Sequence, residues 1–206
     1  MQRVIEYYYT HVSPWAYLGH RAFLDLADRH GYAIRFKPVL LGPVFAESGG
    51  LPLSKRHPLR QAYRLVELQR WREKRGLPLN LRPRHFPADP SLADRIALAL
   101  ALEGGPAGAF TEAAFRLTWV DDRDISDRPV LAAVLETLGL DTDKVLTAAD
   151  GRDIEDRYVS HQSDALAAGV FGSPSYVLNG EVFWGQDRLD LLEDALTSGR
   201  QPYRPD

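Results

Sequence analysis

Hydrophobic and polar positions in the first forty residues predict two strands joined by a helix. Residues 4–10 are rich in β-branched and aromatic side chains and predict a buried strand. Ser13 and Pro14 predict the start of a helix, because serine is a preferred N-cap and proline is preferred at the first helical position. Residues 33–41 predict a second strand, which Pro38 makes irregular or places near a sheet edge.

The middle of the chain has mainly helical periodicity. A stretch rich in glycine and proline, residues 42–53, predicts a loop, and a proline-rich connection is expected at residues 79–90. Apolar residues recur at helical spacing through the rest of this region. The expected helices span residues 59–74, 92–103, 107–120, 130–138, 141–148 and 154–168.

Strand character returns near the C-terminus. Residues 175–178 and 181–184 flank Asn179-Gly180, the strongest short signal for a β-hairpin. Gly185 should end the second of these strands. Asp187 is a suitable cap for a last amphipathic helix.

The order of these elements predicts the fold class. The first strand–helix–strand unit requires a right-handed crossover, which makes its strands parallel, and the hairpin adds two antiparallel strands. We therefore expect an α/β protein with a mixed four-stranded sheet of thioredoxin-like topology. Residues 1–42 and 168–206 would form the thioredoxin-like domain, and residues 43–167 a large all-helical insertion domain.

Composition removes several classes of function. The 206 residues include no cysteine, which excludes a disulfide oxidoreductase, a zinc–thiolate site and an iron–sulfur cluster, so that any sulfur chemistry needs a thiol from a ligand. The net charge of −3 argues against a nucleic-acid binder. The 25 basic residues comprise 21 arginines and 4 lysines, which fits planar recognition of carboxylates and equally fits a GC-rich genome. No signal peptide or apolar run of about 18 residues is present, so we expect a cytoplasmic protein.

The first segment that could carry chemistry is V-S-P-W-A, residues 12–16. Thioredoxin-like redox proteins hold Cys-x-x-Cys where the first strand meets the first helix. In this chain Ser13 and Ala16 occupy the positions of the two cysteines. The start of a helix stabilises an anion through its free N–H groups, and a serine hydroxyl can donate a hydrogen bond to a thiolate. The alternative is that Ser13 only caps the helix.

Two further segments lie near the predicted hairpin. Ser173-Pro174 falls where thioredoxin-like proteins place a cis-proline whose preceding residue pairs with an extended ligand, although an ordinary loop would have the same sequence. In F-W-G-Q-D-R-L, residues 183–189, Gln186 and Asp187 could receive the amino end of a ligand, or Asp187 could simply cap a helix. Arg188 could pair with a carboxylate or with Asp187 itself.

Together these segments make the chain resemble the 2-hydroxychromene-2-carboxylate isomerase family, relatives of kappa-class glutathione transferases and DsbA-type oxidoreductases. The resemblance covers nearly the whole chain and is strongest in V-S-P-W-A-Y-L (12–18), P-V-L-L-G-P-V-F (38–45), F-R-L-T-W-V-D-D-R-D-I-S-D (115–127) and residues 169–189. It implies that Ser13 lies beside the glutathione sulfur and that the backbone of Ser173, before cis-Pro174, binds glutathione. The other implied glutathione contacts are Trp184, Gly185, Gln186 and Asp187 at the γ-glutamyl end, with Arg60 and Ser54.

One departure from the family concerns the residues before Ser13. The family usually reads Phe-Asp-Phe where this chain has Tyr9-Thr10-His11, so that a carboxylate is replaced by the hydroxyl of Thr10. On an alternating strand His11 and Ser13 would face the same side, and His11 could act on the thiol or the substrate as a proton shuttle. The alternative is a hydrogen-bonded structural histidine. The remaining histidines lack the spacing of metal ligands, and no metal site is expected.

The resemblance implies a dimeric enzyme of aromatic-compound degradation. Three functional alternatives stay open. The first is a glutathione-dependent isomerase acting on a small aromatic carboxylate, with glutathione as cofactor and a homodimeric assembly. The second is a kappa-like glutathione transferase or peroxidase. The third is a non-catalytic thioredoxin-like binding module. In the enzymes, the second substrate would lie under the helical insertion, in an apolar cleft lined by Arg60, Trp15, Trp71 or Trp119.

Overall fold

The computed structural model describes residues 3–205. Most helices and all strands form where the periodicity predicts them. The elements in chain order are β1 (Val4–Tyr9), α1 (Pro14–Arg29), β2 (Ala33–Pro38), α2 (Leu41–Ser48), the 3-10 helix η1 (Leu53–Lys55), α3 (Pro58–Arg75), α4 (Ser91–Leu102), α5 (Ala107–Trp119), α6 (Arg128–Thr137), α7 (Thr142–Ala149), α8 (Arg152–Ala167), β3 (Ser175–Leu178), β4 (Glu181–Trp184), the 3-10 helix η2 (Gln186–Arg188) and α9 (Leu189–Ser198).

The sheet has the predicted mixed topology. Its strand order is β2-β1-β3-β4, with β1 parallel to β2 and antiparallel to β3, and with β3 antiparallel to β4. Pro38 pairs with Tyr9 at the last position of β2, which is an edge strand, as the missing N–H of proline requires. The fold class expected from the sequence is therefore confirmed.

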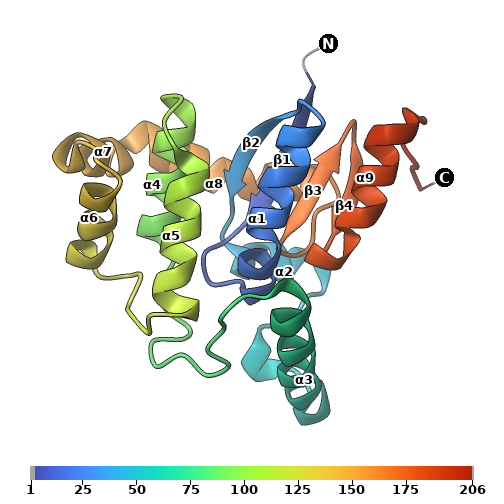
Figure 1. Cartoon of the computed structure of the whole chain (residues 1–206), viewed down its shortest axis with the longest axis horizontal. Coiled ribbons are helices and arrows are strands. Elements are labelled where there is room, and N and C mark those ends of the chain that lie inside the picture. Colours follow the sequence, from blue (N-terminus) through green and yellow to red (C-terminus); the bar gives the residue numbers. More distant parts are fainter. Residues whose placement is uncertain (1–2, 206) are drawn as a thin grey trace.

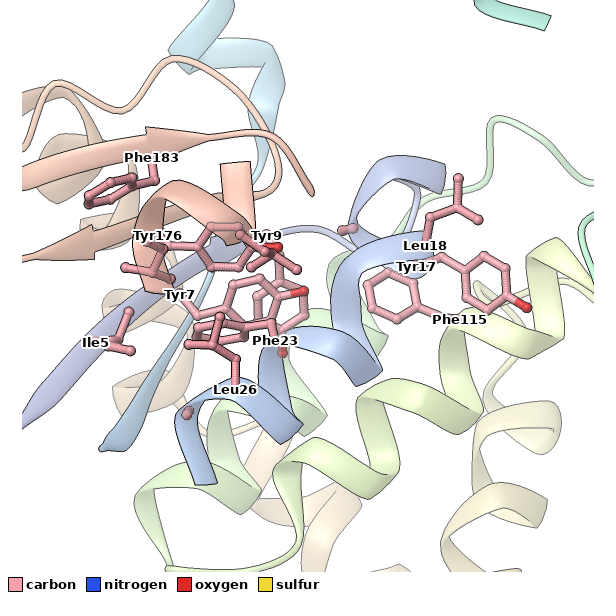
Figure 2. Packing of buried hydrophobic residues seen from close by; sticks show 14 of the residues in the cluster. Ile5, Tyr7, Tyr9, Tyr17, Leu18, Phe23, Leu26, Phe115, Tyr176 and Phe183 are labelled. Atoms are coloured by element: carbon pink, nitrogen blue, oxygen red, sulfur yellow. The ribbon is translucent and has the colours of Figure 1, made fainter. Parts of the chain in front are cut away.

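Alternating residues of β1 face two different cores. Ile5, Tyr7 and Tyr9 are fully buried on the face covered by α1 and α9, whereas Tyr8 packs on the other face with side chains of α2 and α8. Figure 2 shows Tyr7 and Tyr176 of the sheet packed against Phe23 of α1, with the two tyrosine rings stacked at 5.5 Å. This aromatic layer fixes α1, and hence its first turn, against the carboxyl end of β1.

A second core lies within the helical region beside β2 (Figure 1, left). It is formed by apolar side chains of α4 to α8, and Phe36 of β2 packs against both this core and the first one. Leu68, Phe115 and Trp119, which the sequence assigned to the insertion, also belong to the core around α1. Side chains from both proposed domains therefore pack in one core. The division into residues 1–42 with 168–206 and residues 43–167 stays a prediction.

The prediction of a loop over residues 42–53 is wrong in part. Leu41–Ser48 forms α2, and a 3-10 helix follows at Leu53–Lys55. Pro43 is tolerated because it lies in the first helical turn, where N–H groups have no helical acceptor, and Val44 is buried in the core under β1. Gly49 then ends the helix in the left-handed conformation at φ 77°. Glycine and proline mark the ends of this helix rather than a loop.

Within residues 3–205, none of the helices combines the length and the apolar character that crossing a bilayer demands.

Candidate active site

Ser13 caps α1 at the end of the turn that follows β1. Its backbone is extended, with φ −92° and ψ 112°, and its Oγ accepts a hydrogen bond from the backbone N–H of Ala16 at 3.2 Å. Pro14 occupies the first helical position, and the first turn of α1 carries no acidic side chain. The predicted cap is therefore confirmed, and the positive end of the helix is free of an internal counter-charge.

The loop containing Ser173 and Pro174 is joined to this turn by two hydrogen bonds. The Ser13 hydroxyl donates to the backbone carbonyl of Ser173 at 3.1 Å, and the backbone N–H of Thr10 donates to Ser173 Oγ at 3.2 Å. The Ser173–Pro174 peptide bond is cis. Both serines are nearly buried, with Ser13 at 6% and Ser173 at 8% exposure. The fold thus brings together two of the predicted segments, which lie 160 residues apart in the chain.

The third predicted segment is joined to the second through the backbone. Gly185 N–H donates to the Pro174 carbonyl at 2.9 Å, next to the buried side chain of Gln186. Trp184 is half exposed and packs edge-on against Phe171, with ring centroids 4.6 Å apart. Hydrogen bonds therefore connect Ser13, Ser173 and residues 184–187 into one contiguous region.

Asp187 does not cap the last helix as the sequence predicted. It lies inside η2, and α9 begins only at Leu189, without a side-chain cap. Its carboxylate is instead 3.4 Å from a guanidinium nitrogen of Arg188, the pairing left open by the sequence. The short 3-10 turn inserted before α9 moves Asp187 away from the helix start and leaves its carboxylate half exposed.

Arg75 is a site residue that sequence reasoning missed. From the end of α3 its Nε and Nη2 donate to Gln186 Oε1 at 3.1 and 2.9 Å, and Nη2 also donates to the Gln186 carbonyl at 2.9 Å. The sequence signal that could have revealed Arg75 is its spacing from Leu68 and Trp71. This spacing places the arginine on the same helix face as these two apolar residues. Arg75 fixes Gln186 and places a positive charge beside it.

Gly19 allows α1 to approach the Gln186 turn closely. A Cβ at this position would lie 2.5 Å from Gln186 Cβ and 3.0 Å from the Tyr176 hydroxyl oxygen. We expect Gly19→Ala to lower the free energy of unfolding by about 1–3 kcal/mol, because an added methyl group must displace packed neighbours. Chemical denaturation measures this loss. Gly42→Ala in α2, where a Cβ meets nothing within 4 Å, is the matched control and should not destabilise. Equal stability of the Gly19 variant and wild type would contradict the close approach.

The predicted orientation of His11 is wrong. β1 ends at Tyr9, and Ser13 N–H closes a turn onto the Thr10 carbonyl at 3.0 Å, so strand alternation does not extend to Ser13. His11 is fully buried among Tyr9, Phe110 and Phe115. The structure thus favours the alternative interpretation, a hydrogen-bonded structural histidine.

The partner of His11 is Asp94 of α4, a second residue that the sequence did not reveal. Asp94 is fully buried, and its carboxylate lies 2.6 Å from His11 Nδ1 and accepts from His11 N–H at 3.2 Å. Thr10 Oγ1 donates to it at 3.2 Å, and the Tyr158 hydroxyl donates at 2.8 Å. Burial, followed by the charge of Asp94, raises the pKa of Tyr158 well above its ordinary value, so Tyr158 remains a donor. The carboxylate that Thr10 lacks is supplied from a helix 84 residues away.

Other predicted site residues lie at different places. Ser54 and Arg60 are exposed, and their side chains make no hydrogen bond or ion pair within residues 3–205. Trp119 is fully buried and its Nε1 donates to the His11 carbonyl at 3.4 Å, so it is a core residue and cannot line an open cleft. Trp15 and Trp71 are partly buried against the core around α1.

Comparison with known proteins agrees with the observed fold. Residues 4–197 match the family model of the DSBA-like thioredoxin domain. A 2-hydroxychromene-2-carboxylate isomerase of Sphingobium xenophagum is 31% identical over 198 residues, which cover 95% of this chain and 99% of that relative. Glutathione S-transferase kappa 2 of Caenorhabditis elegans is 23% identical over 221 residues, 98% of this chain and 94% of the relative. A solved 2-hydroxychromene-2-carboxylate isomerase has a TM-score of 0.78 at 25% identity, covering 95% of each chain. The chain therefore belongs to the 2-hydroxychromene-2-carboxylate isomerase family of DSBA-like thioredoxin proteins.

Proposed function

We propose that this protein is a glutathione-dependent isomerase that acts on an aromatic carboxylate of the 2-hydroxychromene-2-carboxylate type. The observation that carries the proposal is the Ser13 hydroxyl at the start of α1, 3.1 Å from the Ser173 carbonyl, in a chain without cysteine. A thiolate placed at this point meets a hydrogen-bond donor and the positive end of a helix. The names of the isomerase relatives support the substrate class, and the name of the kappa transferase supports glutathione.

The protein groups suffice to stabilise a bound thiolate. Lowering a thiol pKa from about 8.5 to about 6.5 requires roughly 2.7 kcal/mol. A partly buried helix N-terminus supplies up to about 2 kcal/mol, and a hydrogen bond to a charged group supplies about 1.5–3 kcal/mol. The Ser13 hydroxyl, which donates to the Ser173 carbonyl in this structure, would turn its hydrogen toward the sulfur. No strong base is needed beside the thiol.

The proposed reaction is an addition followed by an elimination. The thiolate forms a C–S bond to the double bond of an aromatic unsaturated keto acid, and the π electrons move onto the conjugated carbonyl oxygen. The former double bond is now single and rotates. The electron pair then returns, the double bond re-forms and the C–S bond breaks, releasing the same thiolate. Glutathione is unchanged overall, which makes it a cofactor.

The residues that would bind glutathione are assigned to the contiguous region formed by Ser13, Ser173 and residues 184–187. Ser13 would hold the sulfur, and the backbone of Ser173 before Pro174 would pair with the extended tripeptide. Its γ-glutamyl end would lie at residues 184–187, where Arg75 adds a positive charge that the sequence did not predict. Ser54 and Arg60 stay predicted glutathione contacts, and we assign them to the remaining, glycyl end. A homodimer, a role in aromatic degradation and a cytoplasmic location, where glutathione is the abundant thiol, complete the proposal.

Binding of glutathione tests the proposal directly. We expect glutathione at one hundred times its dissociation constant to stabilise the protein by about 2.7 kcal/mol, because only the folded state binds it. A thermal-shift titration with glutathione measures this, and S-methylglutathione is the control, because it lacks the ionisable thiol and should bind more weakly. A non-catalytic module would show no shift.

The fate of the sulfur separates the isomerase from a transferase. An isomerase returns free glutathione after each turnover, so less than one equivalent of glutathione suffices for complete conversion of the aromatic acid. A kappa-like transferase would consume one glutathione per product and release a conjugate, which liquid chromatography detects. Accumulation of a conjugate would replace the isomerase assignment with the transferase one.

A further inference from the structure

Three arginines near the start of α3 have no acidic partner. Arg56 precedes the helix, and Arg60 and Arg64 lie one turn apart within it. Within residues 3–205, no carboxylate oxygen lies within 4 Å of any of the three guanidinium groups, and Arg56 donates only to the Leu51 carbonyl, at 2.8 Å. Arg70 of the same helix, in contrast, is paired with Glu67. The positive charge at this end of α3 is therefore available to an anion.

Arg64 and Arg56 are partly buried and Arg60 is exposed, but unlike Arg56, the Arg64 guanidinium makes no hydrogen bond within residues 3–205. It shares the inner face of α3 with Leu68, Trp71 and Arg75, at spacings of four, three and four residues. Its guanidinium carbon lies 5.6 Å from the centre of the Phe86 ring. Burial, with the charge of Arg56 as a smaller cause, lowers the pKa of Arg64 to about 10. A desolvated cation without a counter-charge is unfavourable, and a bound carboxylate would relieve it.

A chain of contacts connects Arg64 to the Ser13 turn. The Phe86 ring under Arg64 packs against Trp119 at 5.2 Å, and Trp119 Nε1 donates to the carbonyl of His11, two residues before Ser13. At its other end, the inner face of α3 meets Gln186 through Arg75. Eleven residues separate the two arginines, about 16 Å along the helix at 1.5 Å per residue. The inner face of α3 thus runs from Gln186, which Arg75 contacts, to Phe86, which Arg64 contacts.

We propose that Arg64 binds the carboxylate of the aromatic acid substrate, with Phe86 as an apolar neighbour for its ring. This inference rests on the proposed function and adds a specificity residue to it. Arg75 already supplies positive charge at the predicted γ-glutamyl end, and exposed Arg60 is assigned to the glycyl end, so both glutathione carboxylates have other cations. The aromatic surroundings of Arg64 suit a flat aromatic acid better than a peptide. Its planar fork matches a carboxylate in two parallel hydrogen bonds.

Kinetics of Arg64→Leu test this assignment. We expect the KM for 2-hydroxychromene-2-carboxylate to rise at least tenfold, because a charge-assisted hydrogen bond is lost. The KM for glutathione should stay within twofold of wild type. Arg64→Lys, which keeps the charge but not the fork, should restore part of the affinity. Arg70→Leu removes an equal charge from the exposed side of the same helix and is the control, with both KM values unchanged. A rise in the KM for glutathione alone, or no rise in either, would overturn the proposal.

A binding experiment separates this proposal from the failure of the proposed function. Calorimetry on the protein without glutathione compares trans-2-hydroxycinnamate with its uncharged alcohol, 2-hydroxycinnamyl alcohol. We expect wild type to prefer the acid at least tenfold and Arg64→Leu to show no preference, whether or not glutathione binds elsewhere. Unfolding midpoints of the variants verify that they are folded. If wild type does not distinguish the acid from the alcohol, Arg64 is not a carboxylate site, even where glutathione binding and turnover are normal.

Discussion

Replacing Asp94 with alanine is expected to lower the free energy of unfolding by about 3–5 kcal/mol, the cost of breaking a buried charged network. The carboxylate accepts from His11 N–H, Thr10 Oγ1 and the Tyr158 hydroxyl, and lies 2.6 Å from His11 Nδ1. All of these groups are buried away from water. Removing Asp94 therefore leaves several polar groups without a partner, each of which costs about 1–3 kcal/mol when buried, although these costs do not simply add.

Urea denaturation of matched variants measures this effect. Asp156→Ala removes an aspartate from the exposed surface of α8, 3.9 Å from Arg152, and should change stability by less than about 0.5 kcal/mol. Asp94→Asn keeps the shape but replaces one acceptor oxygen with a donor, and we expect an intermediate loss. Tyr158→Phe should cost less than Asp94→Ala, since it removes one hydrogen bond and leaves the carboxylate its other partners. A loss below 1 kcal/mol for Asp94→Ala would show that the network does not hold the turn.

The same network has a consequence for the proposed site. Thr10 and His11 form the turn that leads into Ser13, and Thr10 N–H donates to Ser173 Oγ. Asp94 thus holds, from α4, the turn on which the distance between Ser13 and Ser173 depends. It is a positioning residue rather than a catalytic one, because it is fully buried and contacts the turn at Thr10 and His11. The helical region contributes to the site through this contact.

Much of the fold could be predicted because local signals and long-range packing agree. Ser13-Pro14, Asn179-Gly180 and the glycines that end helices act within a few residues, and the aromatic pattern of β1 already indicates a strand buried on both faces. The position of α2 could not be predicted in this way. Its glycine and proline content opposed a helix, and what stabilises it is the burial of Val44 against the sheet.

The residues of the candidate site also fall into two groups, those marked by local sequence motifs and those brought in by tertiary packing. Ser13, Ser173 and Gln186 lie in short motifs that mark the candidate site in the sequence, although the cis bond at Pro174 and the 3-10 turn at Gln186 do not follow from local sequence. Asp94 and Arg75 reach the site from helices 84 and 111 residues distant from their partners, and no local spacing connects them. The orientation expected for His11 fails because β1 ends at Tyr9, so that strand alternation does not reach His11 and Ser13. Local sequence motifs therefore predict where the candidate site forms. The buried polar residues that fix its geometry depend on tertiary packing and are not predicted by those motifs.

Replacing Ser13 with alanine is expected to reduce the kcat/KM of the proposed isomerase by about tenfold to a hundredfold. The hydroxyl is the proposed donor to the glutathione thiolate, and a hydrogen bond to a charged group is worth about 1.5–3 kcal/mol. The pKa of bound glutathione should rise by one to two units on the same grounds, which the ultraviolet absorbance of the thiolate follows during a pH titration. The loss of the cap on Ala16 N–H adds a stability cost of about 1 kcal/mol.

A variant with an intact helix cap separates the thiolate role from the structural one. Ser13→Asp keeps a good N-cap but places a negative charge beside the sulfur, so stability should stay near that of wild type while the thiolate is repelled and activity falls further than in Ser13→Ala. Ser13→Cys should form a mixed disulfide with oxidised glutathione, visible by mass spectrometry as one added glutathionyl group, because a thiol at this position faces the ligand sulfur. If Ser13→Ala leaves turnover and glutathione affinity within twofold of wild type, Ser13 is only a helix cap. If Ser13→Cys also takes up no glutathione, the sulfur binds elsewhere on the protein.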